Sequence, residues 1–172
     1  NNDRAVIFHA DDIGMSQATL PAIEELFEFG LVSSAAVMVP CPWYRGAVEH
    51  AIHHPDLDYG VHLTLNSEWD VFRWGPISTR NPKSGLIDTQ GYFFNNTAQT
   101  AEGADLYAIR TELDSQLLQA RSDGMHITHA DTHMFCLGHP RLIREYIDAA
   151  LSAETLPILM RPGGPGWHKF GF

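Results

Sequence analysis

Short apolar runs alternate with segments of helical periodicity along almost the whole chain of 172 residues. This alternation is typical of βαβ units, in which parallel strands are joined by crossover helices. We therefore predict an α/β fold with a largely parallel sheet, formed by a single domain over residues 1–172. The apolar runs predict strands at 5–9, 32–39, 59–65, 125–133 and 156–160.

The segments between these runs carry the signals of helices. The first predicted helix starts at Ser16 and ends at Gly30, because glycine commonly follows the last helical turn. Its apolar face is formed by Leu20, Ile23, Leu26 and Phe27. The remaining helices are predicted at 43–54, 104–122 and 140–150, the second of these with the apolar stripe Leu106, Ile109, Leu113 and Leu117.

Residues 66–99 show neither the apolar runs of strands nor the apolar spacing of helices, and they are rich in Gly, Pro, Ser and Asn. They are predicted to form a long loop. Long loops inside compact domains are usually functional, so this segment is expected to contribute to a binding site.

Composition narrows the class of partner. The chain is 44% hydrophobic, and its formal charge is −10, with lysine only at Lys83 and Lys169. A groove that follows nucleic-acid phosphates is therefore not expected.

Cys41 and Cys136 lack C-x-x-C spacing and are predicted to be core residues. Because no apolar run reaches membrane-spanning length, we expect no membrane partner and a cytoplasmic location, with earlier processing left open by the start at Asn1.

Two adjacent carboxylates, Asp11 and Asp12, directly follow the first apolar run. In α/β enzymes the ends of strands carry the chemistry. Successive side chains of an extended chain point in opposite directions, and two like charges this close disfavour joint ionisation. We therefore expect a division of labour, with one metal ligand and one base. The alternative is that one of them caps the following helix, which explains one carboxylate at most.

Histidines mark the ends of two further predicted strands. His62 lies in the third strand, while His129, Asp131 and His133 alternate along the fourth and should share one face. Because parallel strands bring their carboxyl ends to one rim, Asp12, His62 and His133 can converge. One carboxylate and two imidazoles leave coordination positions for water, as in a catalytic metal site. A single histidine in a strand is more often a core residue, but that explanation suits three converging side chains less well.

The sequence around these residues forms four motifs, at 10–16 (ADDIGMS), 30–34 (GLVSS), 60–65 (GVHLTL) and 128–133 (THADTH). In this order and spacing they resemble the YdjC-like family of carbohydrate deacetylases, which includes the chitooligosaccharide deacetylases. Segments 74–77, 84–88 and 91–93 are similar to the variable insert of that family. The resemblance covers most of the chain.

The resemblance implies a distorted (β/α) barrel similar to that of NodB-type polysaccharide deacetylases. It also implies that Asp12, His62 and His133 are the metal ligands and that Asp11 is the catalytic base. Such a barrel has more strands than this sequence displays, so we expect either a chain incomplete at its C-terminus or an open architecture. An incomplete barrel would expose apolar edges, which makes a partner such as the second copy of a homodimer an option.

His129 offers a different ligand set. The spacing His129-x-x-x-His133 could place both imidazoles on the ion and leave His62 in a supporting position. We favour His62, because it agrees with the family pattern and lies at a strand end. His129 and Asp131 then suit a role in orienting the ligands through hydrogen bonds.

The chemistry that these parts imply is hydrolysis of an N-acetyl group on a small carbohydrate. A divalent ion, Zn²⁺ first and Mg²⁺ or another ion as alternatives, would lower the pKa of water, and Asp11 would accept its proton. Related proteins supply the proton for the departing amine from a His in a Cys-His-Pro type motif toward the C-terminus. Here His139 precedes a proline and His168 lies near the end, and we assign the role to neither.

Three side chains are candidates for substrate binding. Trp69 and Trp74 in the long loop could stack on sugar rings, although packing inside the protein is an equal alternative for each. Arg161, after the last predicted strand, could bind substrate or neutralise acidic neighbours.

Two other functions fit the same site. A phosphoester hydrolase or another amide hydrolase would need cations in the loop, where only Arg73, Arg80 and Lys83 occur. A metal-binding domain without turnover would fit the absence of an assigned general acid.

Overall fold

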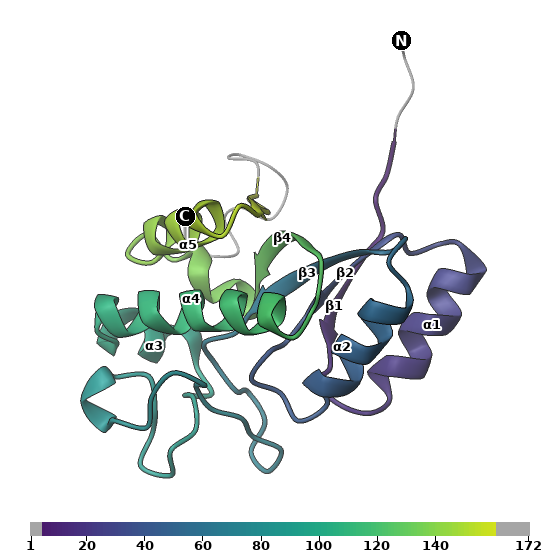
Figure 1. Cartoon of the computed structure of the whole chain (residues 1–172). Coiled ribbons are helices and arrows are strands. Elements are labelled where there is room, and N and C mark those ends of the chain that lie inside the picture. The colour runs from purple at the N-terminus through teal and green to yellow at the C-terminus, as the bar shows by residue number, and fades with distance from the viewer. Residues whose placement is uncertain (1–4, 161–172) are drawn as a thin grey trace.

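A computed structural model describes residues 5–160. Its centre is a sheet of five parallel strands in the order β1-β2-β3-β4-β5 (Figure 1). The strands are β1 (His9–Ile13), β2 (Ser34–Val37), β3 (Asp58–Leu63), β4 (Ile127–Thr132) and β5 (Leu156–Pro157). The α-helices are α1 (Thr19–Phe29), α2 (Tyr44–His53), α3 (Thr97–Gly103), α4 (Leu106–Ser122) and α5 (Ile143–Ser152), with short 3₁₀ helices η1 (Pro82–Ser84) and η2 (His133–Gly138).

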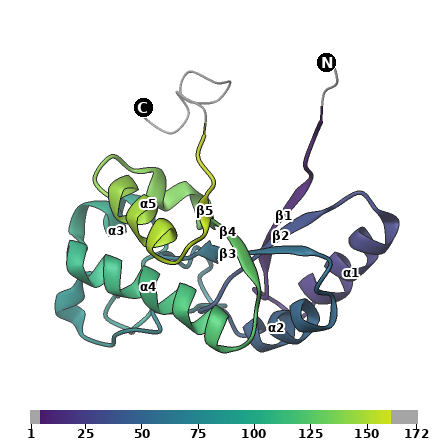
Figure 2. The same cartoon turned by 45° about the horizontal axis from the view of Figure 1, so that its top comes forward.

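The spatial order of the strands equals their order in the sequence. Parallel strands are joined by right-handed crossovers, so an order without reversal places the connecting helices on one face of the sheet, as in a barrel. Figure 2 shows α1 and α2 beside β1 and β2, and α4 and α5 toward β4 and β5. The prediction of an α/β fold with barrel-like winding is confirmed. No helix within residues 5–160 is long and apolar enough to cross a membrane.

The core lies between the sheet and its helices. All four residues of β2 are buried, and three are the small or branched residues Ala35, Ala36 and Val37. The predicted stripe of α4 packs here through Ile109, Leu113 and Leu117, while Leu106 at the helix start is exposed. Small residues in the strand allow close approach of the helices, and the larger aliphatic side chains fill the remaining space.

The first strand lies four residues later than predicted. Its pairing with β2 begins at His9 opposite Ser34. The apolar residues that suggested a strand at 5–9 are exposed, Val6 by 73% and Ile7 by 74%. Pairing with the buried β2 therefore fixes the strand, and it places both carboxylates, Asp11 and Asp12, inside β1.

Helix α1 also begins later than predicted, at Thr19, and no side chain caps it. Neither Asp11 nor Asp12 therefore acts as a helix cap. Its end is as predicted, because Gly30 adopts φ 78° and donates its N–H to the carbonyl of Phe27. Of the predicted apolar face, Leu26 is exposed.

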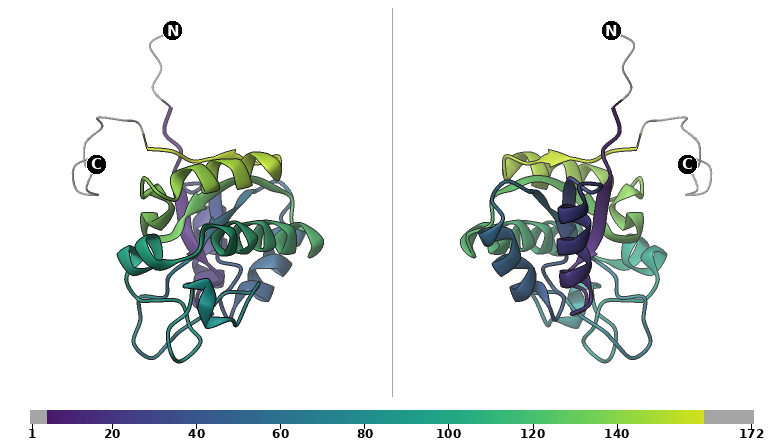
Figure 3. Two further views of the ribbon diagram at one scale, coloured as in Figure 1. Left: turned by 90° about the vertical axis from the view of Figure 1, so that its left-hand side faces the viewer. Right: turned by 90° about the vertical axis from the view of Figure 1, so that its right-hand side faces the viewer.

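The long loop after β3 lies at the end of the molecule opposite the one where the chain enters β1 (Figure 3). Buried side chains of α4 hold it. The carboxylate of Glu112 accepts the backbone N–H groups of Ile77 and Ser78, at 3.1 and 2.8 Å. Gln116 bonds both the N–H and the carbonyl of Thr64, which follows β3. The loop is thus anchored next to the carboxyl end of the third strand.

We expect Gly60→Ala to destabilise the protein. Gly60 in β3 lies opposite His129 in β4, and an added Cβ would approach the imidazole carbon Cδ2 to 2.3 Å and the backbone oxygen to 2.6 Å. Relief of such crowding costs about 1–3 kcal/mol of unfolding free energy. Urea denaturation would measure the loss. Gly103→Ala in α3 is the matched control, since its Cβ meets no atom within 4 Å, and equal stability of the two variants would contradict this packing.

Candidate metal centre and active site

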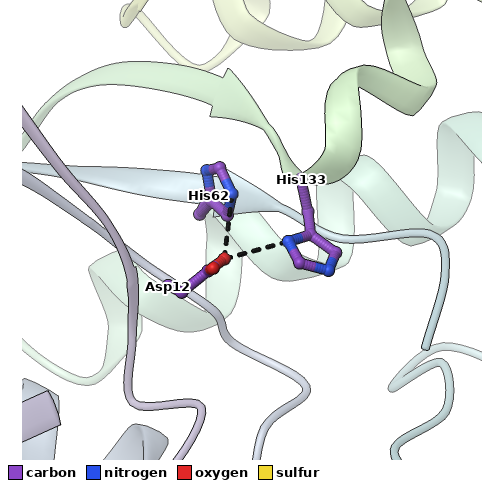
Figure 4. Close-up of side chains that lie close together, drawn as sticks. All are labelled: Asp12, His62 and His133. Atoms are coloured by element: carbon purple, nitrogen blue, oxygen red, sulfur yellow. Dashed lines mark hydrogen bonds and ion pairs between the residues drawn. The ribbon is translucent and has the colours of Figure 1, made fainter. Parts of the chain in front are cut away.

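Asp12, His62 and His133 converge from three separate elements, as Figure 4 shows. Oδ1 of Asp12 lies 3.3 Å from Nε2 of His62 and 2.9 Å from Nδ1 of His133. Both imidazoles are buried, and the carboxylate is partly exposed. The three side chains that sequence reasoning placed at one rim therefore meet around a common point.

The backbone of β1 brings Asp12 to this point. Its pairing with β2 is interrupted between Ala10 and Ile13, and Asp12 adopts φ 63°. Aspartate tolerates this left-handed conformation better than most residues. The irregularity changes the alternating side-chain directions that a regular strand would give Asp11 and Asp12. Strand bulges redirect side chains near active sites in the same way.

Each imidazole of the group is held from its far side by a second carboxylate. Nδ1 of His62 is 2.6 Å from Oδ1 of Asp131, and Nε2 of His133 is 2.9 Å from Oε2 of Glu68. These contacts fix the ring orientations and direct the remaining nitrogens toward Asp12. Metal-binding histidines typically have such a carboxylate partner. An oxygen donor and two nitrogen donors arranged in this way fit a divalent cation.

The same pattern continues to a second group, formed by His9, Asp11 and Asp131. Nε2 of His9 lies 3.0 Å from Oδ2 of Asp131 and 3.1 Å from Oδ1 of Asp11. Its Nδ1 is 2.8 Å from the hydroxyl of Ser34. Carboxylates and imidazoles therefore alternate from Asp11 through His9, Asp131, His62, Asp12 and His133 to Glu68, and we call this series the carboxylate–imidazole chain.

Pairing along this chain lowers the pKa of the carboxyl groups of Asp12 and Asp131 and raises the pKa of the imidazoles of His9 and His62. Burial would raise the pKa of Asp12, but hydrogen bonds from His133 and His62 hold it well below its usual range. Burial lowers the pKa of His62, and hydrogen bonds to Asp12 and Asp131 outweigh this and raise it to about 10. Hydrogen bonds to Asp11 and then Asp131 raise the pKa of His9 to about 9. A cation at Asp12 and His62 must displace protons, so its affinity should rise with pH.

His129 does not join Asp12. Its side chain is 5% exposed, its ring centroid lies 5.1 Å from that of His9, and its Nε2 has no hydrogen-bond partner within the described residues. Asp131, two residues on, instead contacts both His9 and His62. β4 ends at Thr132, and His133 belongs to η2. His129, Asp131 and His133 therefore occupy different environments, although their alternation in the sequence predicted that they share one face of the strand.

Sequence reasoning missed His9 and Glu68. His9 was included in an apolar run, yet its position two residues before Asp11 in a strand was a usable signal, because such residues share a face. Glu68 lies in the loop, whose path no periodicity predicts. The loop fold that brings Glu68 to His133 depends on contacts with α4.

The candidate substrate-binding residues differ in exposure. Trp69 is 53% exposed. Trp74 is only 3% exposed, and its indole N–H donates to the carbonyl of Asn66, so its ring faces are covered by protein here. His139 accepts the backbone N–H of Arg141, which is a local turn contact. Arg161 and His168 lie outside the described residues.

The metal-free protein should lose stability as pH rises from about 6.5 to 9. Folded His9, with its pKa near 9, keeps a proton that an unfolded histidine, with a pKa of 6.5, has released. Because the folded state then binds more protons, raising the pH favours unfolding over this interval. Thermal denaturation of chelator-treated protein at several pH values would measure this. Asp131→Asn removes a partner of both His9 and His62 and should flatten the dependence, and a wild-type stability that stays constant would contradict the pairing.

Comparisons with known proteins agree on one family. The YdjC-like protein family model matches residues 5–170. A carbohydrate deacetylase of Thermoanaerobacter pseudethanolicus is 29% identical over 157 residues, covering 91% of this chain and 60% of the relative. A carbohydrate deacetylase of Enterococcus faecalis is 31% identical over 133 residues, covering 77% of this chain and 49% of the relative. The chain thus spans about half to three fifths of the length of these curated relatives.

A crystal structure shows the same architecture. It is of an Enterococcus faecalis protein provisionally named as a cellobiose-phosphate cleavage protein, and it superposes with a TM-score of 0.78 at 29% sequence identity. The match covers 88% of this chain and 57% of that one. Because the family model extends over nearly the whole sequence, the chain belongs to the YdjC-like protein family.

Proposed function

We propose that this chain carries the metal-dependent active site of a carbohydrate deacetylase, which removes the N-acetyl group of an amino sugar or short oligosaccharide. The observation that supports this most is the convergence of Asp12, His62 and His133 with a further carboxylate, Asp11, one residue from Asp12. The names of the relatives from Thermoanaerobacter and Enterococcus support the same reaction.

In this proposal Asp12, His62 and His133 hold the cation. The mixed oxygen and nitrogen donors favour Zn²⁺, with Mg²⁺ or another divalent ion as alternatives. The cation would supply Lewis acidity, which lowers the pKa of water and polarises an amide carbonyl. Asp131 and Glu68 keep the imidazoles in orientation through the hydrogen bonds described above.

Asp11 is proposed as the general base. Its side chain is 55% exposed, so water and substrate can reach it, and Nε2 of His9 contacts one of its oxygens. A carboxylate beside a polarised amide can accept the proton of the attacking water. Trp69, exposed in the loop after β3, is the better placed of the two tryptophans to stack on a sugar ring.

A phosphorylated sugar is the second substrate class, because the Enterococcus faecalis structure is named for cellobiose-phosphate cleavage. The loop arginines argue against a phosphate site here. Arg73 is bound to Asp88 and to the carbonyl of Phe93, and Arg80 donates to the carbonyls of Pro76 and Thr79. Both guanidinium groups therefore stabilise the loop itself, and we rank the N-acetylated sugar first.

The protein should release acetate from N,N′-diacetylchitobiose, and Asp11→Asn should reduce kcat by at least about a hundredfold, since a general base contributes roughly 10²–10⁴-fold. Chelation should abolish release, and Zn²⁺ should restore it. An enzyme-coupled acetate assay would measure each rate. Asp56→Asn, at an exposed acidic residue between α2 and β3, is the control. Release that survives both chelation and Asp11→Asn would refute the proposal.

The two candidate ligand sets make different predictions for metal content. His62→Ala should remove most of the bound metal, because it deletes a nitrogen that faces Asp12. His129→Ala should retain it, since His129 is not among the converging side chains. Elemental analysis of both purified variants decides between them, and full retention in His62→Ala would favour the set with His129.

A further inference from the structure

His9 is tied to three strands of the sheet. It belongs to β1, its Nδ1 contacts Ser34 across the pair with β2, and its Nε2 contacts Asp131 of β4. The side chain is about one fifth exposed. A largely buried imidazole with both nitrogens engaged has little freedom to rotate. Its Nε2 is therefore a fixed point at the edge of the candidate metal centre.

Asp11 depends on this fixed point. His9 and Asp11 are two residues apart in a strand and share one face. Nε2 of His9 lies 3.1 Å from Oδ1 of Asp11, and His9 is the only cationic partner of Asp11 within residues 5–160. A carboxylate that is 55% exposed and lacked this contact would sample several rotamers. With Oδ1 held by His9, Oδ2 is the oxygen left for water.

Charge strengthens the same contact. Nε2 of His9 faces two carboxylates, Asp11 and Asp131, and hydrogen bonds to both keep the imidazole protonated at neutral pH by raising its pKa to about 9. Hydrogen bonds between a charged donor and a carboxylate are shorter and stronger than neutral ones, so the imidazolium holds Asp11 more firmly than a neutral ring would.

We propose that His9 is a positioning residue for the reaction: its imidazole orients the carboxylate of Asp11. The inference rests on the proposed function in taking Asp11 as the base. It goes beyond that function by linking the base to the metal ligands, because Asp131 contacts both His9 and His62. The base and the ligands then share one rigid frame.

The first test measures acetate release by Zn²⁺-loaded protein. His9→Ala removes the group that holds Oδ1 of Asp11. It should lower kcat about tenfold, because a misplaced base reacts more slowly, while KM and bound zinc stay the same. His9→Gln keeps a hydrogen-bond donor and should recover part of the lost kcat. His126→Gln, at an exposed histidine just before β4, is the control and should leave kcat unchanged. A kcat that His9→Ala leaves at the wild-type value would overturn the proposal.

The second test needs no catalysis. NMR titration of the histidine rings in metal-free protein should give His9 a pKa near 9, and Asp11→Asn should lower it by about one unit. A His9 pKa that is the same in both proteins would overturn the positioning role even if wild-type protein released no acetate. Absence of acetate release with a coupled titration would instead count against the proposed function alone. The two failures are therefore distinguishable.

Discussion

One buried carboxylate, Asp131, holds the candidate site together. Its two oxygens contact different imidazoles, His62 at 2.6 Å and His9 at 3.0 Å. Isolating a charge in a protein interior is costly unless it is paired and hydrogen-bonded, and here the two histidines satisfy that requirement. Because those histidines come from β3 and β1, while Asp131 comes from β4, the pairing fixes three strands relative to one another at the level where the side chains meet. The site and the strand arrangement therefore constrain each other.

The irregularity in β1 allows Asp11 and Asp12 to take part in the same series of contacts. A regular strand would direct Asp11 and Asp12 to opposite faces, yet Asp11 contacts His9 and Asp12 contacts His62 and His133 in one connected series. The left-handed conformation of Asp12 makes this compatible with pairing to β2 on both sides of the break. Local backbone strain of this type persists where the surrounding contacts enforce it. The two imidazoles beside Asp12 provide such contacts.

The sequence predicts the parts of this arrangement that depend on period and order. Alternating apolar runs predict parallel strands, and strand ends predict that Asp12, His62 and His133 meet. The predicted position of β1 is wrong, because the run that contains the exposed Val6 and Ile7 is more apolar than the segment His9–Ile13, which forms the strand and contains two aspartates. Which apolar run pairs is decided by contacts between strands, and periodicity carries no information about them. Glu68 was missed for a related reason, since its position follows from the fold of the loop.

The loop after β3 carries both Glu68, which contacts His133, and the exposed Trp69. Glu68 orients His133, and the adjacent Trp69 is exposed to solvent. The buried carboxylate of Glu112 anchors the same loop to α4 through the N–H groups of Ile77 and Ser78. A movement of Trp69 on contact with a sugar would be transmitted to Glu68 through one peptide bond and from there to the imidazole of His133. In the proposed function, changes in this loop would therefore have to preserve the Glu68–His133 contact, so substrate binding and the geometry of the candidate metal centre would be coupled.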